Sequence, residues 1–275
     1  MTPNRISPQQ AAQTLFERRH PSANCLLLAG SIVRGEATAS SDLDIVVLYD
    51  EGDLPHAYRE SLLWEGFPVE TFVHSPQTLR YFFEKMDGPS GFPTLMQMVS
   101  EAIEIPVPTP LSTQMKQAAN DCLLAGPPPL PPHDLQLRRY IITDLIDDIR
   151  TPRSPHELTA TGTQLYAALP DFYFRSQNLW SAKGKTMLRK LHQHNPDFAQ
   201  RFIIAFDTLF STANPHPVIA LAEEVLTPSG GFLFDGHRLD APADFRLSNS
   251  DLPAHQKRVV LIPPPSAPAI PHFPG

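Results

Sequence analysis

The sequence predicts an α/β domain followed by an all-α helical bundle domain. Three short runs rich in aliphatic and β-branched residues, at 23–29, 43–49 and 67–74, are expected to form strands, with helical patterns before, between and after them. A proline-rich break, GPPPLPP at 126–132, then interrupts the chain. Beyond it, the amphipathic patterns have helical spacing and no strand-like alternation intrudes.

The first domain is expected to begin with a helix over 7–19, because Ser7 is suited to the N-cap and Pro8 to the first turn. The strands within 26–29 and 45–49 are short and aliphatic, which favours buried parallel strands. Helical patterns in this domain cover 54–65, 77–86 and 92–102. Those of the second domain cover 134–150, 155–179, 183–194, 196–212 and 216–226.

These boundaries give four segments. We predict a first domain at 1–126, a linker at 127–132 and a helical domain at 133–250. The remaining segment, 251–275, is proline-rich and is expected to lack fixed structure.

Composition narrows the possible partners and the compartment. The 275 residues carry 22 Lys and Arg against 29 Asp and Glu, a formal net charge of −7, and no basic run stands out. Long nucleic acid is therefore not favoured as a partner, whereas a small molecule or a protein is. No apolar run has membrane-spanning length, the N-terminus lacks a signal-peptide core, and the two cysteines suit a reducing compartment. We expect no membrane partner and a cytoplasmic location.

The most informative segment joins Gly30-Ser31 to Asp42-Leu43-Asp44 through a small loop. Side chains alternate along a strand, so Asp42 and Asp44 point to the same face and repel one another unless a cation lies between them. Such hard oxygen ligands favour Mg²⁺, which takes further ligands from water and substrate phosphates. Gly30 and Ser31, expected at the start of a helix, offer backbone N–H groups and a hydroxyl to an anion.

This spacing resembles the nucleotidyltransferase superfamily, which includes DNA polymerase beta, the aminoglycoside nucleotidyltransferases and the minimal nucleotidyltransferases. The motif covers about 50 residues at the N-terminal end of the chain. The resemblance implies a nucleotidyltransferase domain with a small mixed sheet and a pair of Mg²⁺ ions held by Asp42, Asp44 and a third carboxylate. It also implies ATP as the co-substrate.

Glu70 is the candidate for the third carboxylate. It lies in the middle of the predicted strand at 67–74, where a charged group amid apolar residues is costly unless it is paired or bound to metal. Its surroundings resemble the strand that carries the catalytic base of aminoglycoside adenylyltransferases. An exposed face of an edge strand is the alternative, and Asp50, Glu51 and Asp53 compete by proximity.

Basic residues at two places are candidates for phosphate contacts. Arg34 follows Ser31 by three residues, on the same expected helical turn. Lys183 and Lys185 flank Gly184 at the start of a predicted helix. In the two-domain aminoglycoside adenylyltransferases the helical domain supplies a basic residue to the nucleotide, so the resemblance implies this role for Lys183 or Lys185. A solvated helix start is the alternative.

Together these features predict a transferase that moves AMP from ATP to a hydroxyl of a small-molecule acceptor and releases pyrophosphate. A protein AMP-transferase of antitoxin type and a non-catalytic nucleotide-binding module remain alternatives, and the intact set of carboxylates argues against the latter. An aminoglycoside acceptor would need an acidic pocket, for which Asp144, Asp147 and Asp148 are candidates, although a solvated helix face explains them as well.

Overall fold

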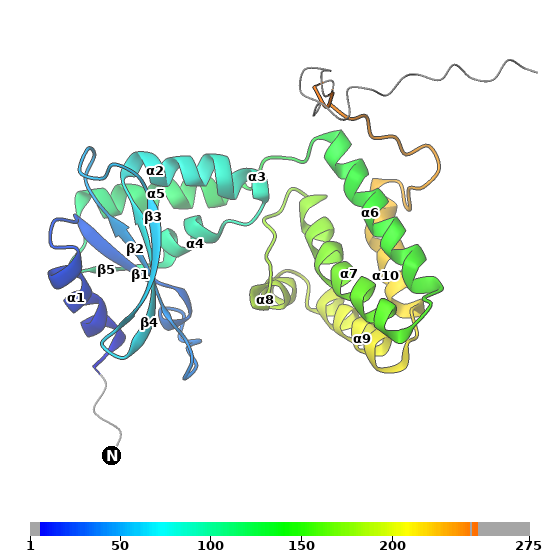
Figure 1. Ribbon diagram of the computed structural model, residues 1–275, viewed down its shortest axis with the longest axis horizontal. Helices are drawn as coiled ribbons and strands as arrows, with labels where there is room; N and C mark the ends of the chain where they lie inside the picture. The colour runs from blue at the N-terminus through cyan, green and yellow to red at the C-terminus, as the bar shows by residue number, and fades with distance from the viewer. Residues whose placement is uncertain (1–5, 243, 247–275) are drawn as a thin grey trace, which may run out of the picture. The chain divides into compact units, whose positions relative to one another are not determined.

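The structure is a computed structural model that describes residues 6–242 and 244–246. The chain divides into two compact units, residues 1–237 and 238–275. All helices and strands of the described residues lie in the first unit (Figure 1). They form a small mixed sheet with helices, followed by a helical region, so the predicted fold class is confirmed.

Among the described residues one five-stranded sheet forms, in the order β3-β4-β2-β1-β5. Strands β2 and β4 pair in parallel, whereas β1 is antiparallel to both β2 and β5. The expected parallel alignment of the first two strands is therefore wrong, because a short loop without a crossover helix joins them. The strands are β1 (Cys25–Ala29), β2 (Leu43–Leu48), β3 (Tyr58–Trp64), β4 (Phe67–His74) and β5 (Ile103–Ile105).

Strand β3 occupies most of the segment that was expected to be a helix at 54–65. It forms a hairpin with β4, turning through Glu65 and Gly66, whose φ angles are 47° and 79°. Positive φ at both central residues is the geometry that matches the twist of paired strands. Pairing with β4 stabilises this segment as a strand, and that contact outweighs the helical periodicity of its sequence.

Helices cover both faces of the sheet (Figure 1). Helix α1 packs on the face formed by Leu26, Leu28 and Ile45. The opposite face, which includes Leu27 and Val46, packs against the helices that follow β4. Those elements are α2 (Pro76–Tyr81), the π-helical η2 (Phe82–Asp87), the short α3 (Gly88–Ser90), α4 (Thr94–Glu101) and α5 (Pro110–Ala125), while α1 spans Pro8–Arg19.

The later helices enclose a core of their own. Its centre is formed by aromatic and aliphatic side chains such as Phe172, Phe202 and Phe206. The segment after α7 leaves this core: Trp180 is 9% exposed, packs among the residues beside the sheet and donates from Nε1 to the Leu123 carbonyl at 2.9 Å. The helices are α6 (Pro132–Arg150), α7 (Pro155–Arg175), α8 (Lys185–His194), α9 (Pro196–Thr212) and α10 (His216–Leu226), followed by η3 (Thr227–Ser229).

Several expected elements lie where the sequence put them. Ser7 caps α1 with a reciprocal capping box, and α9 and α10 have the expected bounds. Neither β5 nor α5 was assigned from the sequence. The domain boundaries around 126–132 stay a prediction, and the whole of the proline-rich segment at 251–275 lies outside the described residues. Among the described residues, no helix combines the length and the apolar composition needed to cross a membrane.

Asp87 fixes the start of α4. The N-cap position of that helix is Pro93, which offers no side-chain acceptor, and the Asp87 carboxylate instead accepts the backbone N–H groups of Leu95 at 2.8 Å and Met96 at 3.0 Å. Asp87→Ala leaves two buried donors unsatisfied, so we expect the free energy of unfolding to fall by about 1–3 kcal/mol in urea titrations.

The matched control is Asp121→Ala, which removes an exposed carboxylate on α5 that accepts a hydrogen bond from Gln117 in its own helix. Its effect is expected to stay within about 0.5 kcal/mol. An equal loss in the two variants would contradict the role of Asp87 as the cap.

Candidate active site

Three carboxylates meet at one end of the central strands. Asp44 lies in β2, where it is in register with Ala29 of β1 on one side and Glu70 of β4 on the other. Asp42 precedes β2 by one residue and shares the face of Asp44, since Leu43 between them points into the opposite core. The parallel pairing of β2 with β4 thus brings Glu70 beside the Asp pair.

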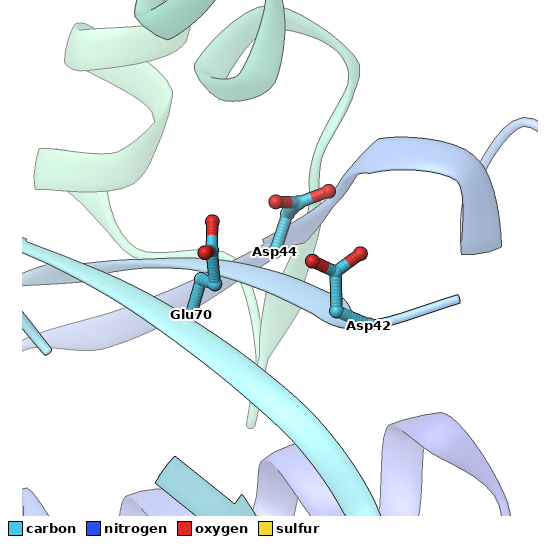
Figure 2. A group of neighbouring side chains, drawn as sticks. All are labelled: Asp42, Asp44 and Glu70. Carbon is cyan, nitrogen blue, oxygen red and sulfur yellow. The ribbon is translucent and has the colours of Figure 1, made fainter. Parts of the chain in front are cut away.

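One oxygen from each of Asp42, Asp44 and Glu70 lies within 4.8 Å of the others. Figure 2 shows the three side chains rising from neighbouring strands to the same side. All three are partly exposed, so the group opens to solvent. Three hard oxygen donors at this separation suit a divalent cation such as Mg²⁺.

Asp44 carries the electrostatic cost of this arrangement. Burial, as the largest cause, together with the neighbouring charges of Asp42 and Glu70 raises the pKa of its carboxyl to about 6. Arg34 and Lys185 act in the opposite direction without cancelling the rise. A cation between the carboxylates would relieve this repulsion, so the three side chains are suited to hold a metal ion.

Gly30 touches Asp44 directly. Its φ is +78°, and a Cβ atom built on it would lie 2.1 Å from Oδ2 of Asp44. Only glycine allows the backbone to approach the carboxylate this closely. The expected helix start at Gly30 and Ser31 is instead a single 3-10 turn, Gly30–Ile32, in which Ser31 is 9% exposed. The expected helix therefore ends after a single turn, and residues 33–42 form the turns and loop that lead to β2.

Arg34 and the Gly30 amide share one partner, Glu101. The Glu101 carboxylate accepts the Gly30 N–H at 3.0 Å and pairs with Nη1 of Arg34 at 2.5 Å. Burial raises the pKa of Glu101, against the favourable effect of Arg34. Sequence reasoning missed Glu101, because it closes α4, far from Gly30 in the chain, and no local motif marks it.

The other groups around Arg34 are also charged. Arg34 pairs with Glu36 at 3.1 Å, and Glu36 pairs with Arg189 of α8 at 2.6 Å. These residues line a cavity of about 310 Å³ that also includes Glu101 and Lys190.

Glu70 lies on an interior strand rather than on the sheet edge. Its Oε2 pairs with Nη2 of Arg59 at 2.5 Å, and the Arg59 guanidinium also lies over the Phe72 ring, 4.9 Å from its centroid. Arg59 was missed because its segment was expected to be helical, which hid the hairpin register that brings it to Glu70.

The two candidate lysines lie in different surroundings. Lys185 is the first residue of α8, and its charge lowers the pKa of Asp44. Lys183 precedes the helix; its Nζ lies 5.2 Å from the centroid of the Phe92 ring, in a cavity that it shares with Asp44 and Glu70. Both lysines therefore lie on the side of the carboxylates, and their contacts to phosphate stay a prediction.

Comparison with known families agrees with this geometry. Residues 16–80 match the model of the nucleotidyltransferase domain. The matched segment runs from α1 to α2 and includes Gly30, Asp42, Asp44 and Glu70. The predicted superfamily is confirmed for this segment, and with it the predicted class of enzyme, a nucleotidyltransferase.

Among curated proteins, none matches the chain. Among solved structures, a nucleotidyltransferase-like protein from Exiguobacterium sibiricum is 13% identical to it, with a TM-score of 0.42. The similarity covers 81% of this chain and 76% of that one. A likeness of this strength is too weak to bear on function.

The raised pKa of Asp44 has a measurable consequence for stability. The folded carboxyl titrates at about 6, above its unfolded value of about 3.9, so the folded protein holds a proton that the unfolded chain releases. The stability of the metal-free protein should therefore fall as pH rises between these two values. Asp44→Asn should remove this contribution and be at least as stable as the wild type at neutral pH, as measured by urea unfolding in a chelator.

The control is Asp53→Asn, which changes an exposed carboxylate in the loop after β2 and should keep the wild-type pH dependence. If Asp44→Asn also keeps the wild-type pH dependence, that dependence does not come from the raised pKa of Asp44.

Proposed function

We propose that this protein is a Mg²⁺-dependent nucleotidyltransferase that moves AMP from ATP to a hydroxyl of a small-molecule acceptor. The observation that carries the proposal is the group of Asp42, Asp44 and Glu70, whose oxygens converge within 4.8 Å beside the Gly30 turn. The family match over residues 16–80 supports a nucleoside triphosphate as the donor.

The residues divide the work of the reaction. Asp42, Asp44 and Glu70 would hold the metal, which when bound neutralises phosphate charge and polarises the attacking and leaving oxygens. Glu70 also takes the proton of the acceptor hydroxyl. The new bond joins that oxygen to the α-phosphorus, the bond to the β-phosphate oxygen breaks, and pyrophosphate leaves. Positioning and charge neutralisation supply most of the rate.

The β- and γ-phosphates belong on the turn at Gly30 and Ser31. Arg34 lies beside it, and Lys185 contributes positive charge at Asp44. The Glu101 carboxylate accepts hydrogen bonds from the Gly30 N–H and from Nη1 of Arg34, the same two groups that would bind phosphate oxygens. Triphosphate binding on this turn must therefore displace Glu101 or accept its repulsion.

Glu101→Gln should tighten ATP binding. The amide oxygen can still accept the Gly30 N–H, while the negative charge that competes with phosphate is gone. A charge-assisted bond exceeds a neutral one by about 1 kcal/mol, so we expect a gain of about five- to tenfold in affinity, measured by calorimetry with Mg²⁺ and ATP.

Glu104→Gln is the matched control, since Glu104 lies on β5 and pairs with Lys116 at 3.2 Å. It should bind ATP as the wild type does. Unchanged or weaker binding by Glu101→Gln would mean that Glu101 supports the turn rather than competing with phosphate.

Asp42 and Glu70 should separate binding from catalysis. Asp42→Ala removes a metal ligand and should abolish both stabilisation by Mg-ATP and formation of AMP. Glu70→Gln removes the base and should lower the rate by about 10²- to 10⁴-fold while changing nucleotide affinity much less. The readouts are thermal unfolding with Mg-ATP, and pyrophosphate release with water as the slow acceptor.

Asp53→Asn again serves as the control and should behave as the wild type in both assays. The proposal fails if Asp42→Ala is still stabilised by Mg-ATP as strongly as the wild type, since the carboxylates would then not hold the metal. Full turnover by Glu70→Gln would remove Glu70 from the role of base.

A further inference from the structure

Two cavities of different chemistry, one beside the Gly30 turn and one lined by the carboxylates themselves, bear on how the substrates bind. The first, of about 310 Å³, contains Arg34, Glu101 and Arg189 and lies on the side of the Gly30 turn. The second, of about 660 Å³, is lined by Asp44 and Glu70 and extends over a largely apolar surface. Six apolar side chains line it: Phe72, Phe82, Met86, Phe92, Leu95 and Met98. We call this second space the aromatic cavity.

The ionisable groups of the aromatic cavity are nearly all committed elsewhere. The Asp87 carboxylate caps α4 through the N–H groups of Leu95 and Met96. Arg59 pairs with Glu70 and lies over Phe72, and Lys183 lies over Phe92. Beyond the carboxylates assigned to metal, the lining offers no free acidic group to a ligand. The rest of it is mainly apolar and aromatic, with two cations that already lie over Phe72 and Phe92.

The position of Glu70 decides which cavity faces the acceptor. In an in-line displacement the attacking oxygen approaches from the side opposite to the leaving pyrophosphate, close to the group that takes its proton. Glu70 lines the aromatic cavity and also a more open surface beside Asp42 and Leu63, and it is not among the residues that line the first cavity, which contains Arg34 and Glu101. The triphosphate on the Gly30 side and the acceptor on the Glu70 side therefore fill different cavities.

We propose that the aromatic cavity binds the acceptor, and that the acceptor is a hydroxyl compound with a flat aromatic or apolar body and no ammonium groups. This assignment rests on the proposed function. The body packs against Phe92 and its neighbours, and the hydroxyl is directed to Glu70, which receives the proton as the oxygen–phosphorus bond forms and pyrophosphate leaves. The aromatic faces supply most of the affinity through apolar contact.

The same lining disfavours a polycation such as an aminoglycoside. Ammonium groups need carboxylates, and those of this cavity are the proposed metal ligands Asp44 and Glu70 and the helix cap Asp87. The acidic residues that the sequence suggests for that purpose are exposed on α6 and do not line the aromatic cavity: Asp144, Asp147 and Asp148.

The test compares two probes that both carry hydroxyl groups. Para-nitrophenyl glucoside has an uncharged aromatic body, and kanamycin has several ammonium groups. Calorimetry on the full chain, with Mg²⁺ and a non-hydrolysable ATP analogue, should detect binding of the glucoside and none of kanamycin. Phe92→Ala should weaken glucoside binding about tenfold or more, because it removes the aromatic face.

Two further variants make the result decisive. Met86→Ala truncates a side chain that is 51% exposed and should also weaken the glucoside, even if Phe92→Ala fails to fold. Leu63→Ala is the control, because Leu63 lines the more open surface beside Asp42 and Glu70 and does not line the aromatic cavity, so it should have no effect. Binding of kanamycin alone, of neither probe, or of a glucoside that responds to Leu63 and not to Phe92 or Met86 would overturn the assignment.

Failure of the proposed function would look different. Glucoside binding that depends on Phe92, together with a wild-type protein that is not stabilised by Mg-ATP, would retain the cavity and remove the transfer reaction. Stabilisation by Mg-ATP without glucoside binding would retain the proposed reaction and overturn the assignment of the aromatic cavity.

Discussion

The structure depends on the register between β2 and β4, because that register places Glu70 beside Asp44 and so concentrates three negative charges at one point of the sheet. Asp44 is the central member of the group. On its other side it faces Ala29 of β1, and Gly30 follows Ala29 in the chain. Its raised pKa shows that the folded protein bears this charge at a cost. A one-residue slip of β4 would turn Glu70 to the opposite face of the sheet, away from Asp42 and Asp44.

The surroundings answer this charge in two ways. Arg34 and Lys185 lower the pKa of Asp44, while Arg59 pairs with Glu70 from the hairpin strand. The Gly30 N–H and the Arg34 guanidinium are in turn both bonded to the Glu101 carboxylate. Metal and triphosphate would replace these internal contacts with stronger ones, which couples the binding of the two.

Sequence alone reached the parts of the site that are local in the chain. Gly30, Asp42 and Asp44 belong to one motif, and Glu70 stood out as a charge within an apolar strand. Groups that arrive from distant elements were not predictable, because Glu101 and Arg59 meet the site only through packing of α4 and pairing of β3. The segment at 54–65 was expected to be helical, although the Glu65-Gly66 turn that follows β3 is typical of a hairpin. The antiparallel direction of β1 and β2 was not predictable, because it is a property of the sheet rather than of either strand.

The central claim is that Asp42, Asp44 and Glu70 hold a divalent cation together with the triphosphate. The most direct measurement uses Mn²⁺ as a spectroscopic substitute for Mg²⁺ and follows its electron paramagnetic resonance signal during titration into the protein, with and without a non-hydrolysable ATP analogue. The account predicts saturable binding that strengthens when the analogue is present and disappears when Asp44 is replaced by Asn. Binding that is unsaturable, or that survives this replacement unchanged, would contradict it.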